Sequence, residues 1–229
     1  ISIFCFALAL KTNLKIYWFL LPIFLGISFL SKQAPSGYIF LIIVSLSIIH
    51  FIFNFNIKKI ISGIFGSISI ISVFLITLQM GEISFLSFLE QYILYPLSIG
   101  ENRLEFIFPL EFKRIILRFK LIHLSSLLLL IIIFKKIVEN YKYIKTDEFL
   151  IIISLILSSY ALITHQLMTV NGMYIFFIIP ILTAFSHIYY LKYFKNRNYI
   201  FYLLIVLSVG STTHYAKKYI HTRDFADLR

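Results

Sequence analysis

Eight apolar runs separated by short polar segments constrain this chain more than any other feature of its sequence. A run of about 20 apolar residues matches the bilayer's hydrocarbon thickness, and a helix satisfies its own backbone hydrogen bonds in lipid. Several runs hold only 14 to 16 residues, so flanking Tyr, Ser and Lys or local bilayer thinning would complete those crossings. The runs cover residues 1–10, 16–30, 38–55, 60–80, 121–134, 149–164, 173–191 and 199–214.

Composition supports a membrane class. The 229 residues are 60% hydrophobic and 14% charged, with a mean hydropathy of +0.92, whereas a soluble domain averages about 25% charged residues. The alternating ten-residue pattern of outer-membrane barrel strands does not occur. We therefore predict an all-α, polytopic transmembrane protein with about seven to eight spans, forming a single domain over residues 1–229. The chain begins inside an apolar run, at Ile1, and we interpret it as a fragment incomplete at both ends.

The distribution of Lys and Arg indicates which side of the membrane each connection faces. Alternate short connections hold eleven Lys and Arg, whereas the short connections between them hold only Lys32. Cytoplasmic loops carry the excess of Lys and Arg, so the lysine-poor connections are predicted to be extracytoplasmic. The loop at 81–120 and the C-terminal tail share that side. Lys217, Lys218 and Arg223 in the tail run against the rule, which makes the last span the weakest part of this topology.

The long loop at 81–120 is predicted to hold interfacial helices. Polar residues recur every three to four positions from Ser84 to Gln91 among Phe, Leu, Tyr and Ile. That narrow polar stripe is typical of an amphipathic helix lying in the membrane interface. Pro96 is expected to end this helix, and a second amphipathic segment is predicted at 104–120.

Several function classes are excluded or disfavoured. The net charge of +11 does not indicate nucleic-acid binding, because the basic residues lie between apolar runs and form no patch with exposed aromatics. The histidines lack the spacing of a zinc site, so no metal site is predicted. His50, His123 and His187 lie singly in apolar runs and are expected to pack against or bond a neighbouring helix. The sequence does not decide whether a divalent cation bridges a donor phosphate. It also does not decide the oligomeric state.

Polar groups gather at the predicted outer ends of the spans, at Lys32-Gln33, Tyr92 to Arg103, His165 to Asn171 and His214 to His221. Cations with amide and imidazole donors at a membrane surface suit a phosphate or pyrophosphate headgroup. Lys32 would neutralise such a phosphate, and Gln33, Gln166 and Asn171 would donate hydrogen bonds to it. An ionisable residue at membrane level is by default a functional candidate.

Each of these residues also has a plainer interpretation. Lys32 is able to extend its ammonium to the headgroups without binding a substrate. His165 and Gln166 are also suited to capping the end of a span. Asn171-Gly172 is typical of a turn.

Short motifs resemble one known family. The segment G-I-S-F-L-S-K-Q-A-P at 26–35 resembles the G-x-x-F-L-(S/T)-K-(Q/G) segment of the GT-C superfamily of integral-membrane glycosyltransferases. Its protein-mannosyltransferase-like and aminoarabinose-transferase-like bacterial branch is the most similar. Two later segments also resemble that branch. The first consists of Gln91-Tyr92, residues 95–100 and Arg103, and the second of His165-Gln166, Asn171 and residues 174–180. The resemblance covers about residues 16–190.

This resemblance implies an enzyme of the bacterial inner membrane that takes a sugar from a polyprenyl-phosphate-linked donor on the extracytoplasmic face. The expected partners are that donor and membrane lipids, without nucleic acid. Lys32, Gln33 and Arg103 are assigned to the donor phosphate, and substrate contacts are assigned to Tyr92, His165, Gln166 and Asn171. The family's catalytic carboxylate lies in the first outer loop, whereas this chain has no Asp or Glu before Glu82. The general base is therefore expected upstream of Ile1, and no residue of this chain receives that role.

Two other classes stay open. A polytopic transporter or lipid flippase also uses polar residues at membrane depth, usually with broken helices or repeated halves. This sequence has one Pro-Gly break, at 35–37, and no matching second half. A non-catalytic membrane scaffold, with the loop helix as its docking surface, is the third class.

Overall fold

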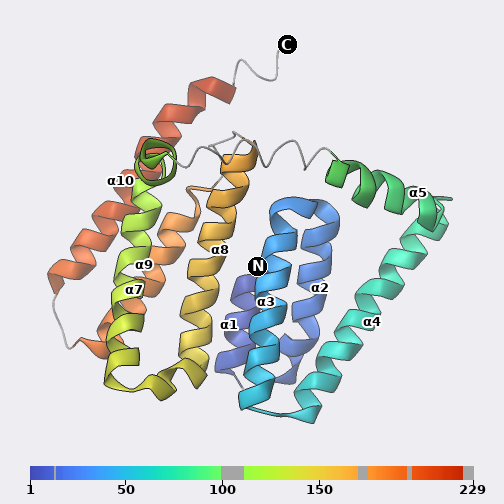
Figure 1. The fold of residues 1–229 in the computed structure, drawn as a ribbon, viewed down its shortest axis with the longest axis horizontal. Coiled ribbons are helices and arrows are strands. Elements are labelled where there is room, and N and C mark those ends of the chain that lie inside the picture. Colours follow the sequence, from blue (N-terminus) through green and yellow to red (C-terminus); the bar gives the residue numbers. More distant parts are fainter. Residues whose placement is uncertain (13, 99–110, 170–174, 195–197, 224–229) are drawn as a thin grey trace. The chain divides into compact units, whose positions relative to one another are not determined.

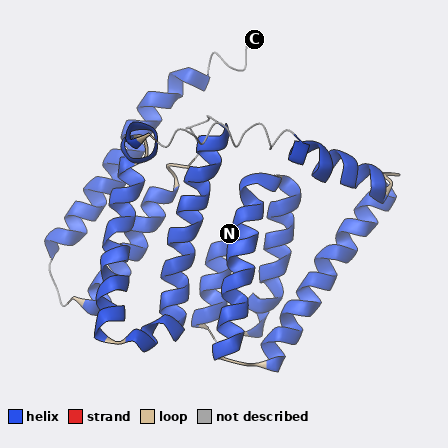
Figure 2. Cartoon of the chain, viewed as in Figure 1, coloured by secondary structure: helices blue, strands red, loops and turns tan. Residues whose placement is uncertain are grey.

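The computed structural model describes residues 1–12, 14–98, 111–169, 175–194 and 198–223. Every regular element in these ranges is a helix, and Figure 2 draws no strand in them. The predicted all-α class is therefore confirmed for the described part of the chain.

Each of the eight apolar runs contains a helix. These helices are α1 (Ser2–Lys11), α2 (Lys15–Ser31), α3 (Gln33–Phe53), α4 (Ile57–Met80), α7 (Lys120–Glu139), α8 (Asp147–Thr169), α9 (Ile178–Tyr193) and α10 (Asn198–Arg223), shown in Figure 1. Five are long and apolar enough to cross a membrane, namely α3, α4, α7, α8 and the stretch Tyr199–Lys217 of α10. The other three, α1, α2 and α9, hold 10, 17 and 16 residues. The count of seven to eight spans therefore stays a prediction.

Hydropathy located the helices better than it located their ends. α8 begins at Asp147 and ends at Thr169, so it extends five residues past the apolar run that ends at Thr164. The predicted outer connection at 165–172 is therefore helical in its first part. Backbone hydrogen bonding decides where a helix ends, and it does not require apolar side chains.

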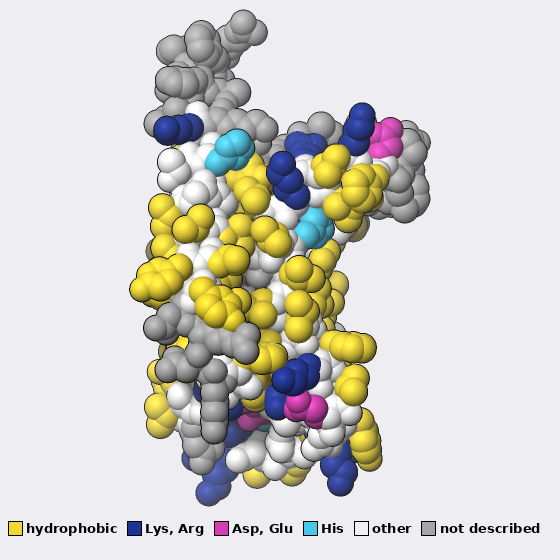
Figure 3. Space-filling view, turned by 90° about the vertical axis from the view of Figure 1, so that its left-hand side faces the viewer, with side chains coloured by type: hydrophobic (Ala, Val, Ile, Leu, Met, Phe, Trp, Pro, Cys, Tyr) yellow, Lys and Arg dark blue, Asp and Glu magenta, His cyan; other side chains and the backbone are white. Residues whose placement is uncertain are grey.

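The chain divides into two compact units, one made of 1–108 with 145–161 and the other of 109–144 with 162–229. In the first unit α2 contacts α1, α3 and α4, and in the second α9 contacts α7 and α10. Figure 3 shows hydrophobic side chains over the middle of one side of the molecule, with Lys and Arg gathered toward its ends. Such a pattern suits a belt of lipid between two aqueous faces.

Small residues of α4 allow α2 and α4 to pack closely. The hydroxyl of Ser62 donates a hydrogen bond to the Lys15 carbonyl at 2.8 Å. A Cβ atom on Gly66 would lie only 2.0 Å from the Phe19 carbonyl oxygen, so this side of α4 touches the backbone of α2 directly. Pro22 lies in α2 at the same contact, where its Cγ would be 2.8 Å from that Cβ. Close backbone approach through small residues is a common way for helices to pair in membranes.

The three histidines in apolar runs contact neighbouring elements, which confirms the expectation for them. The His50 Nδ1 lies 2.9 Å from the Asp147 Oδ1, and its ring stacks on Trp18 with centroids 5.3 Å apart. The His123 Nε2 lies 3.0 Å from the Ile115 carbonyl oxygen. The His187 ring lies 4.8 Å from the ring of Phe201 in α10.

His50 of α3 and Asp147 in the first turn of α8 lie at ion-pair distance within the first unit, without the geometry of a hydrogen bond. His50 is 2% exposed, so its ring nitrogens have little access to water. Replacing Asp147 by alanine is expected to lower the free energy of unfolding by about 1–3 kcal/mol, because it removes the carboxylate beside a buried imidazole. Chemical unfolding in detergent micelles measures this loss.

Glu148→Ala is the matched control for Asp147→Ala. Both carboxylates lie in the first turn of α8, where a negative charge interacts favourably with the helix dipole. The control removes that dipole interaction without touching the His50 contact. Adding His50→Ala to each variant identifies the source of the loss: the Asp147 effect should shrink in the His50→Ala background, whereas the Glu148 effect should not, and an unchanged Asp147 effect would contradict the pairing.

Candidate functional site

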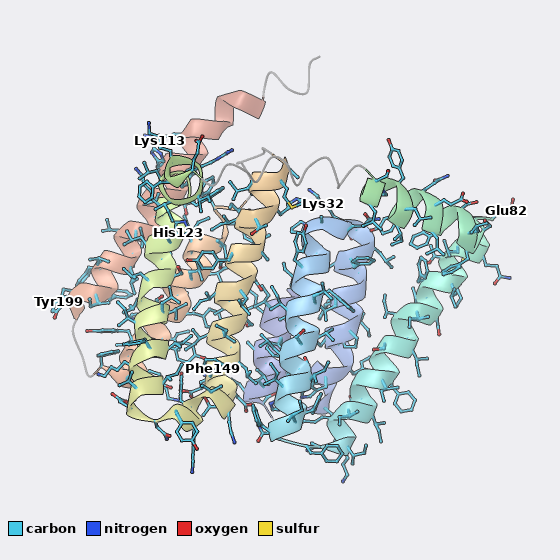
Figure 4. The ribbon with its side chains drawn as sticks, in the orientation of Figure 1. Lys32, Glu82, Lys113, His123, Phe149 and Tyr199 are labelled. Carbon is cyan, nitrogen blue, oxygen red and sulfur yellow. The ribbon has the colours of Figure 1, made fainter. Side chains whose placement is uncertain are left out.

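The candidate site lies at the junction between α2 and α3. α2 ends at Ser31, Lys32 adopts an extended backbone with φ −160° and ψ 113°, and α3 begins at Gln33. The Lys32 N–H donates a hydrogen bond to the Ser28 carbonyl at 3.1 Å. The Lys32 side chain is exposed, and Figure 4 places it at the turn joining the two helices. The Lys32 ammonium is thus located at the break between two apolar helices.

The first turn of α3 is irregular, and hydroxyl and aromatic contacts hold it against α2. Ala34 has non-helical φ and ψ of −113° and 128°, which separates Gln33 from the regular part of α3. The Ser28 hydroxyl donates to the Ser36 hydroxyl at 3.1 Å, across the junction. Sequence reasoning missed this serine pair, although hydroxyl residues on both sides of a helix break are a usable signal.

The Gln33 side chain supplies a second polar group. Its Nε2 is buried and has no hydrogen-bond partner among the described residues. An amide donor buried without an acceptor costs about 1–3 kcal/mol. A ligand oxygen at the junction would recover that cost, with the Lys32 ammonium next to it in sequence.

The predicted amphipathic helix lies beside this junction, in the first unit. It forms as α5 (Phe85–Leu89), continues as the π-helical turn η1 (Glu90–Leu94), and remains helical to residue 98. The Ser84 hydroxyl accepts the Ser87 N–H at 3.0 Å and so caps its start. Pro96 does not end the helix as predicted. A proline removes one backbone donor, which a helix is able to lose without ending there.

Tyr92 connects the amphipathic helix to the end of α2. Its hydroxyl donates to the carbonyl oxygens of Leu30 at 2.7 Å and of Phe29 at 2.5 Å. Carbonyls in the last turn of a helix have no partner within the helix, so Tyr92 caps α2. Burial raises the pKa of the Tyr92 phenol above its ordinary value, which favours the protonated, donating form.

Aromatic rings complete this docking. The Phe88 ring lies 4.8 Å from the Phe74 ring of α4 and 4.9 Å from the Tyr92 ring. Tyr92 in turn meets Phe29 of α2 edge-on, with centroids 6.2 Å apart. The loop helix is therefore held to both α2 and α4, while Phe85 and Leu86 in its first turn stay exposed.

Replacing Tyr92 by phenylalanine is expected to loosen this helix from the end of α2. The variant keeps the ring contacts and loses both hydrogen bonds, which should destabilise the docked state by about 1–2 kcal/mol. Hydrogen exchange of the backbone amides of residues 85–94 measures the loss as roughly tenfold faster exchange.

Tyr95→Phe is the control for Tyr92→Phe, because the Tyr95 side chain is exposed on the same helix.

A pH series adds a second check. The raised pKa means that Tyr92 docking is complete below the ordinary tyrosine pKa of about 10 and is lost as pH rises through the raised value. Exchange in the Tyr92→Phe protein should lack this alkaline step. An identical alkaline step in both proteins would contradict the assignment.

The remaining predicted site residues lie in the second unit or outside the described residues. His165 and Gln166 are buried in α8, at 8% and 5% exposure, and belong to the second unit. The Gln166 Oε1 is buried without a hydrogen-bond partner among the described residues, so it is a second unsatisfied amide. Arg103 and Asn171 lie outside the described residues.

Among the described residues of the first unit, no carboxylate forms an ion pair with Lys32. Glu82, the first carboxylate in the chain, lies at the corner between α4 and α5, at the opposite end of the loop helix from Lys32 (Figure 4). Among the described residues, no group of three or more His, Cys, Asp or Glu could hold a metal ion. The polar side-chain groups described at the junction are the Lys32 ammonium, the Gln33 amide and the hydroxyls of Ser28 and Ser36.

In the part of the chain that the structure describes, the fold is all-helical, with five candidate membrane spans and a docked amphipathic helix beside an exposed lysine. Comparison of the chain with protein-family models, with curated proteins and with solved structures finds no match.

Proposed function

We propose that this chain is part of a membrane glycosyltransferase. It would move a sugar from a polyprenyl-phosphate-linked donor to an acceptor on the extracytoplasmic face of a bacterial inner membrane, which it crosses seven to eight times. The observation that carries the proposal is the α2–α3 junction, where the exposed Lys32 adjoins Gln33, whose buried Nε2 has no hydrogen-bond partner among the described residues. A cation with a neighbouring amide donor is suited to a phosphate oxygen.

Each candidate residue has a role in this proposal. Lys32, Gln33 and Arg103 bind the donor phosphate, with Lys32 neutralising its charge and Gln33 donating from Nε2. Tyr92 fixes the end of α2, and so positions Lys32, through its bonds to the Phe29 and Leu30 carbonyls. The remaining candidates contact the substrate; these are His165, Gln166 and Asn171.

The proposed reaction is a displacement at the anomeric carbon of the donor sugar. The acceptor hydroxyl oxygen forms the new bond, and the bond from that carbon to the phosphate oxygen breaks. The lipid phosphate leaves with the electron pair, and the hydroxyl proton passes to a general base that we assign to no residue of this chain. Lys32 and Arg103 stabilise the charge that develops on the departing phosphate, as preorganised cations do.

A lipid flippase is the second candidate, and one observation favours it. The non-helical Ala34 interrupts α3 beside Lys32, and interrupted helices are common in transporter binding sites. The flippase would use the same phosphate contacts to carry the lipid across the membrane without breaking a bond.

Reconstitution separates the two candidates. The intact protein is placed in proteoliposomes with a fluorescent polyprenyl-phosphate sugar and a soluble acceptor, and both sugar transfer and lipid movement are measured. Transfer supports the glycosyltransferase, and movement without transfer supports the flippase. The absence of both activities would overturn the proposal and favour a scaffold.

Sidedness is tested on its own. In a Cys5→Ser background, Lys32→Cys is treated in whole cells with an impermeant thiol reagent, and Lys142→Cys serves as the control for the opposite face. Labelling at position 32 without labelling at 142 is expected. The reverse pattern would place the junction in the cytoplasm and remove the basis for the proposal.

A further inference from the structure

Three lysines and three aromatic rings converge where α7 and α9 end, in the second unit (Figure 1). The Lys135 ammonium lies 4.2 Å from the Phe194 ring centroid, and the Lys136 ammonium lies 4.5 Å from that of Tyr193. Lys192 also meets the Tyr193 ring, at 5.6 Å. We name this group, with Tyr143 and Glu139, the inner lysine cluster.

We propose that the inner lysine cluster binds the headgroup of one anionic phospholipid. The site is distinct from the α2–α3 junction and does not depend on the proposed glycosyl transfer. Its lysines belong to the connections that the positive-inside rule places in the cytoplasm. Basic sites between helices on that side bind anionic lipid headgroups.

The charge balance of the cluster leaves room for one anion. Glu139 contacts two of the three lysines, with Oε2 2.7 Å from the Lys136 ammonium and Oε1 3.8 Å from that of Lys135. The carboxyl ends of α7 and α9 each contribute roughly half a negative charge. Counting only these described groups, three ammonium groups, one carboxylate and two helix ends sum to about one positive charge, a sign that suits an anionic phosphodiester.

The aromatic rings hold the ammonium groups in place before a ligand arrives. An ammonium over a ring face is attracted by the ring's electrons, and the contact restricts a side chain that is otherwise flexible. Tyr143 is buried, and its hydroxyl lies 3.5 Å from that of Tyr193. The Tyr193 hydroxyl donates to that of Tyr143, which links the end of α9 to the segment after α7.

Apolar side chains around the cluster favour a lipid over free phosphate. Phe134 and Val138 on α7 are 73% and 71% exposed, and they flank Lys135 and Lys136 in the sequence. Leu191, beside Lys192 on α9, is also exposed. The acyl chain of a bound lipid would contact these apolar side chains while the lipid headgroup contacted the lysines.

Native mass spectrometry of the full chain tests this proposal. Phosphatidylglycerol and phosphatidylethanolamine with the same acyl chains are titrated onto the detergent-solubilised protein, and the dissociation constant of the first bound lipid is measured. The triple variant Lys135→Gln, Lys136→Gln, Lys192→Gln is expected to weaken phosphatidylglycerol binding by roughly tenfold or more, with little change for phosphatidylethanolamine.

A matched variant separates the cluster from general surface charge. Lys15→Gln, Lys58→Gln, Lys59→Gln removes the same charge from the first unit, on the same predicted side, and should change binding less than twofold. Tyr193→Leu changes no charge and should weaken phosphatidylglycerol binding about threefold, whereas Tyr199→Leu at an exposed position should not. Thermal unfolding of each variant confirms that it is folded.

Three results would overturn the proposal. Equal weakening by both lysine triples would show that overall charge, and not this cluster, attracts the lipid. Unchanged binding in the cluster variant would remove these residues from the site. Displacement of phosphatidylglycerol by glycerol phosphate at equal concentration would show a phosphate site that does not recognise a lipid.

Discussion

Lys32→Ala is expected to reduce glycosyl transfer by the intact protein by roughly 10²–10³-fold, while the amount of folded protein in the membrane stays unchanged. The ammonium at the α2–α3 junction is exposed, so removing it breaks no contact in the core. Its proposed role is to stabilise charge on the departing phosphate, and that contribution is largest in the transition state. The fall should therefore appear mainly in kcat, measured with a polyprenyl-phosphate sugar donor in membranes.

Two further substitutions sharpen the Lys32 test. Lys32→Arg keeps the positive charge and should retain about a tenth of the activity or more, because a guanidinium also binds phosphate but places its charge differently. Lys59→Ala removes a lysine from the first turn of α4, on the opposite predicted face, and should change transfer less than twofold. Unchanged transfer in Lys32→Ala would exclude Lys32 from the mechanism.

Gly66→Leu is expected to give the largest loss of stability, about 3 kcal/mol or more. A Cβ at position 66 would lie 2.0 Å from the Phe19 carbonyl oxygen and 2.9 Å from its carbonyl carbon. These are backbone atoms of α2, so no side-chain rotation relieves the clash. The helices must move apart, which also strains the hydrogen bond from Ser62 to the Lys15 carbonyl. Thermal unfolding in detergent measures the loss.

Two glycines serve as controls for Gly66. A Cβ on Gly63, one turn away on α4, would lie 3.6 Å from the Trp18 carbonyl oxygen, which is an ordinary contact. Gly210 in α10 has nothing within 4 Å of that position. Alanine at either site should be neutral or stabilising by about 1 kcal/mol, because alanine favours helix over glycine. A similarly mild effect of Gly66→Leu would show that α2 and α4 do not pack in the way described.

The sequence predicted helices well because apolar length is a direct consequence of the bilayer. Each apolar run contains a helix, and the amphipathic segment at 84–94 is helical. Helix ends were predicted less well. His165 and Gln166 were assigned to an outer connection, yet they are buried within α8. Hydropathy falls at such polar residues although the backbone ladder continues through them.

The candidate site was predicted in part. Lys32 and Gln33 were singled out by residue type beside a Pro-Gly break predicted at 35–37. The break is observed earlier, at Lys32 and Ala34, and residues 35–37 lie in α3, because proline and glycine are tolerated in the first turn of a helix. Tyr92 was assigned to a substrate, and this assignment stays a prediction; its hydroxyl bonds the carbonyls that end α2. That partner lies more than 60 residues away in the chain, so no local pattern could identify it. The assigned phosphate contacts remain predictions.

The sequence alone determined the helical class and the place of the lysine between two apolar helices, because hydropathy and helix breakers act locally. Tertiary structure decided which residues meet across the chain. It brought Gly66 onto the backbone of α2, His50 to Asp147, and Tyr92 to the end of α2. These pairings depend on how helix surfaces fit together in three dimensions, and that fit is not encoded in any single stretch of the chain.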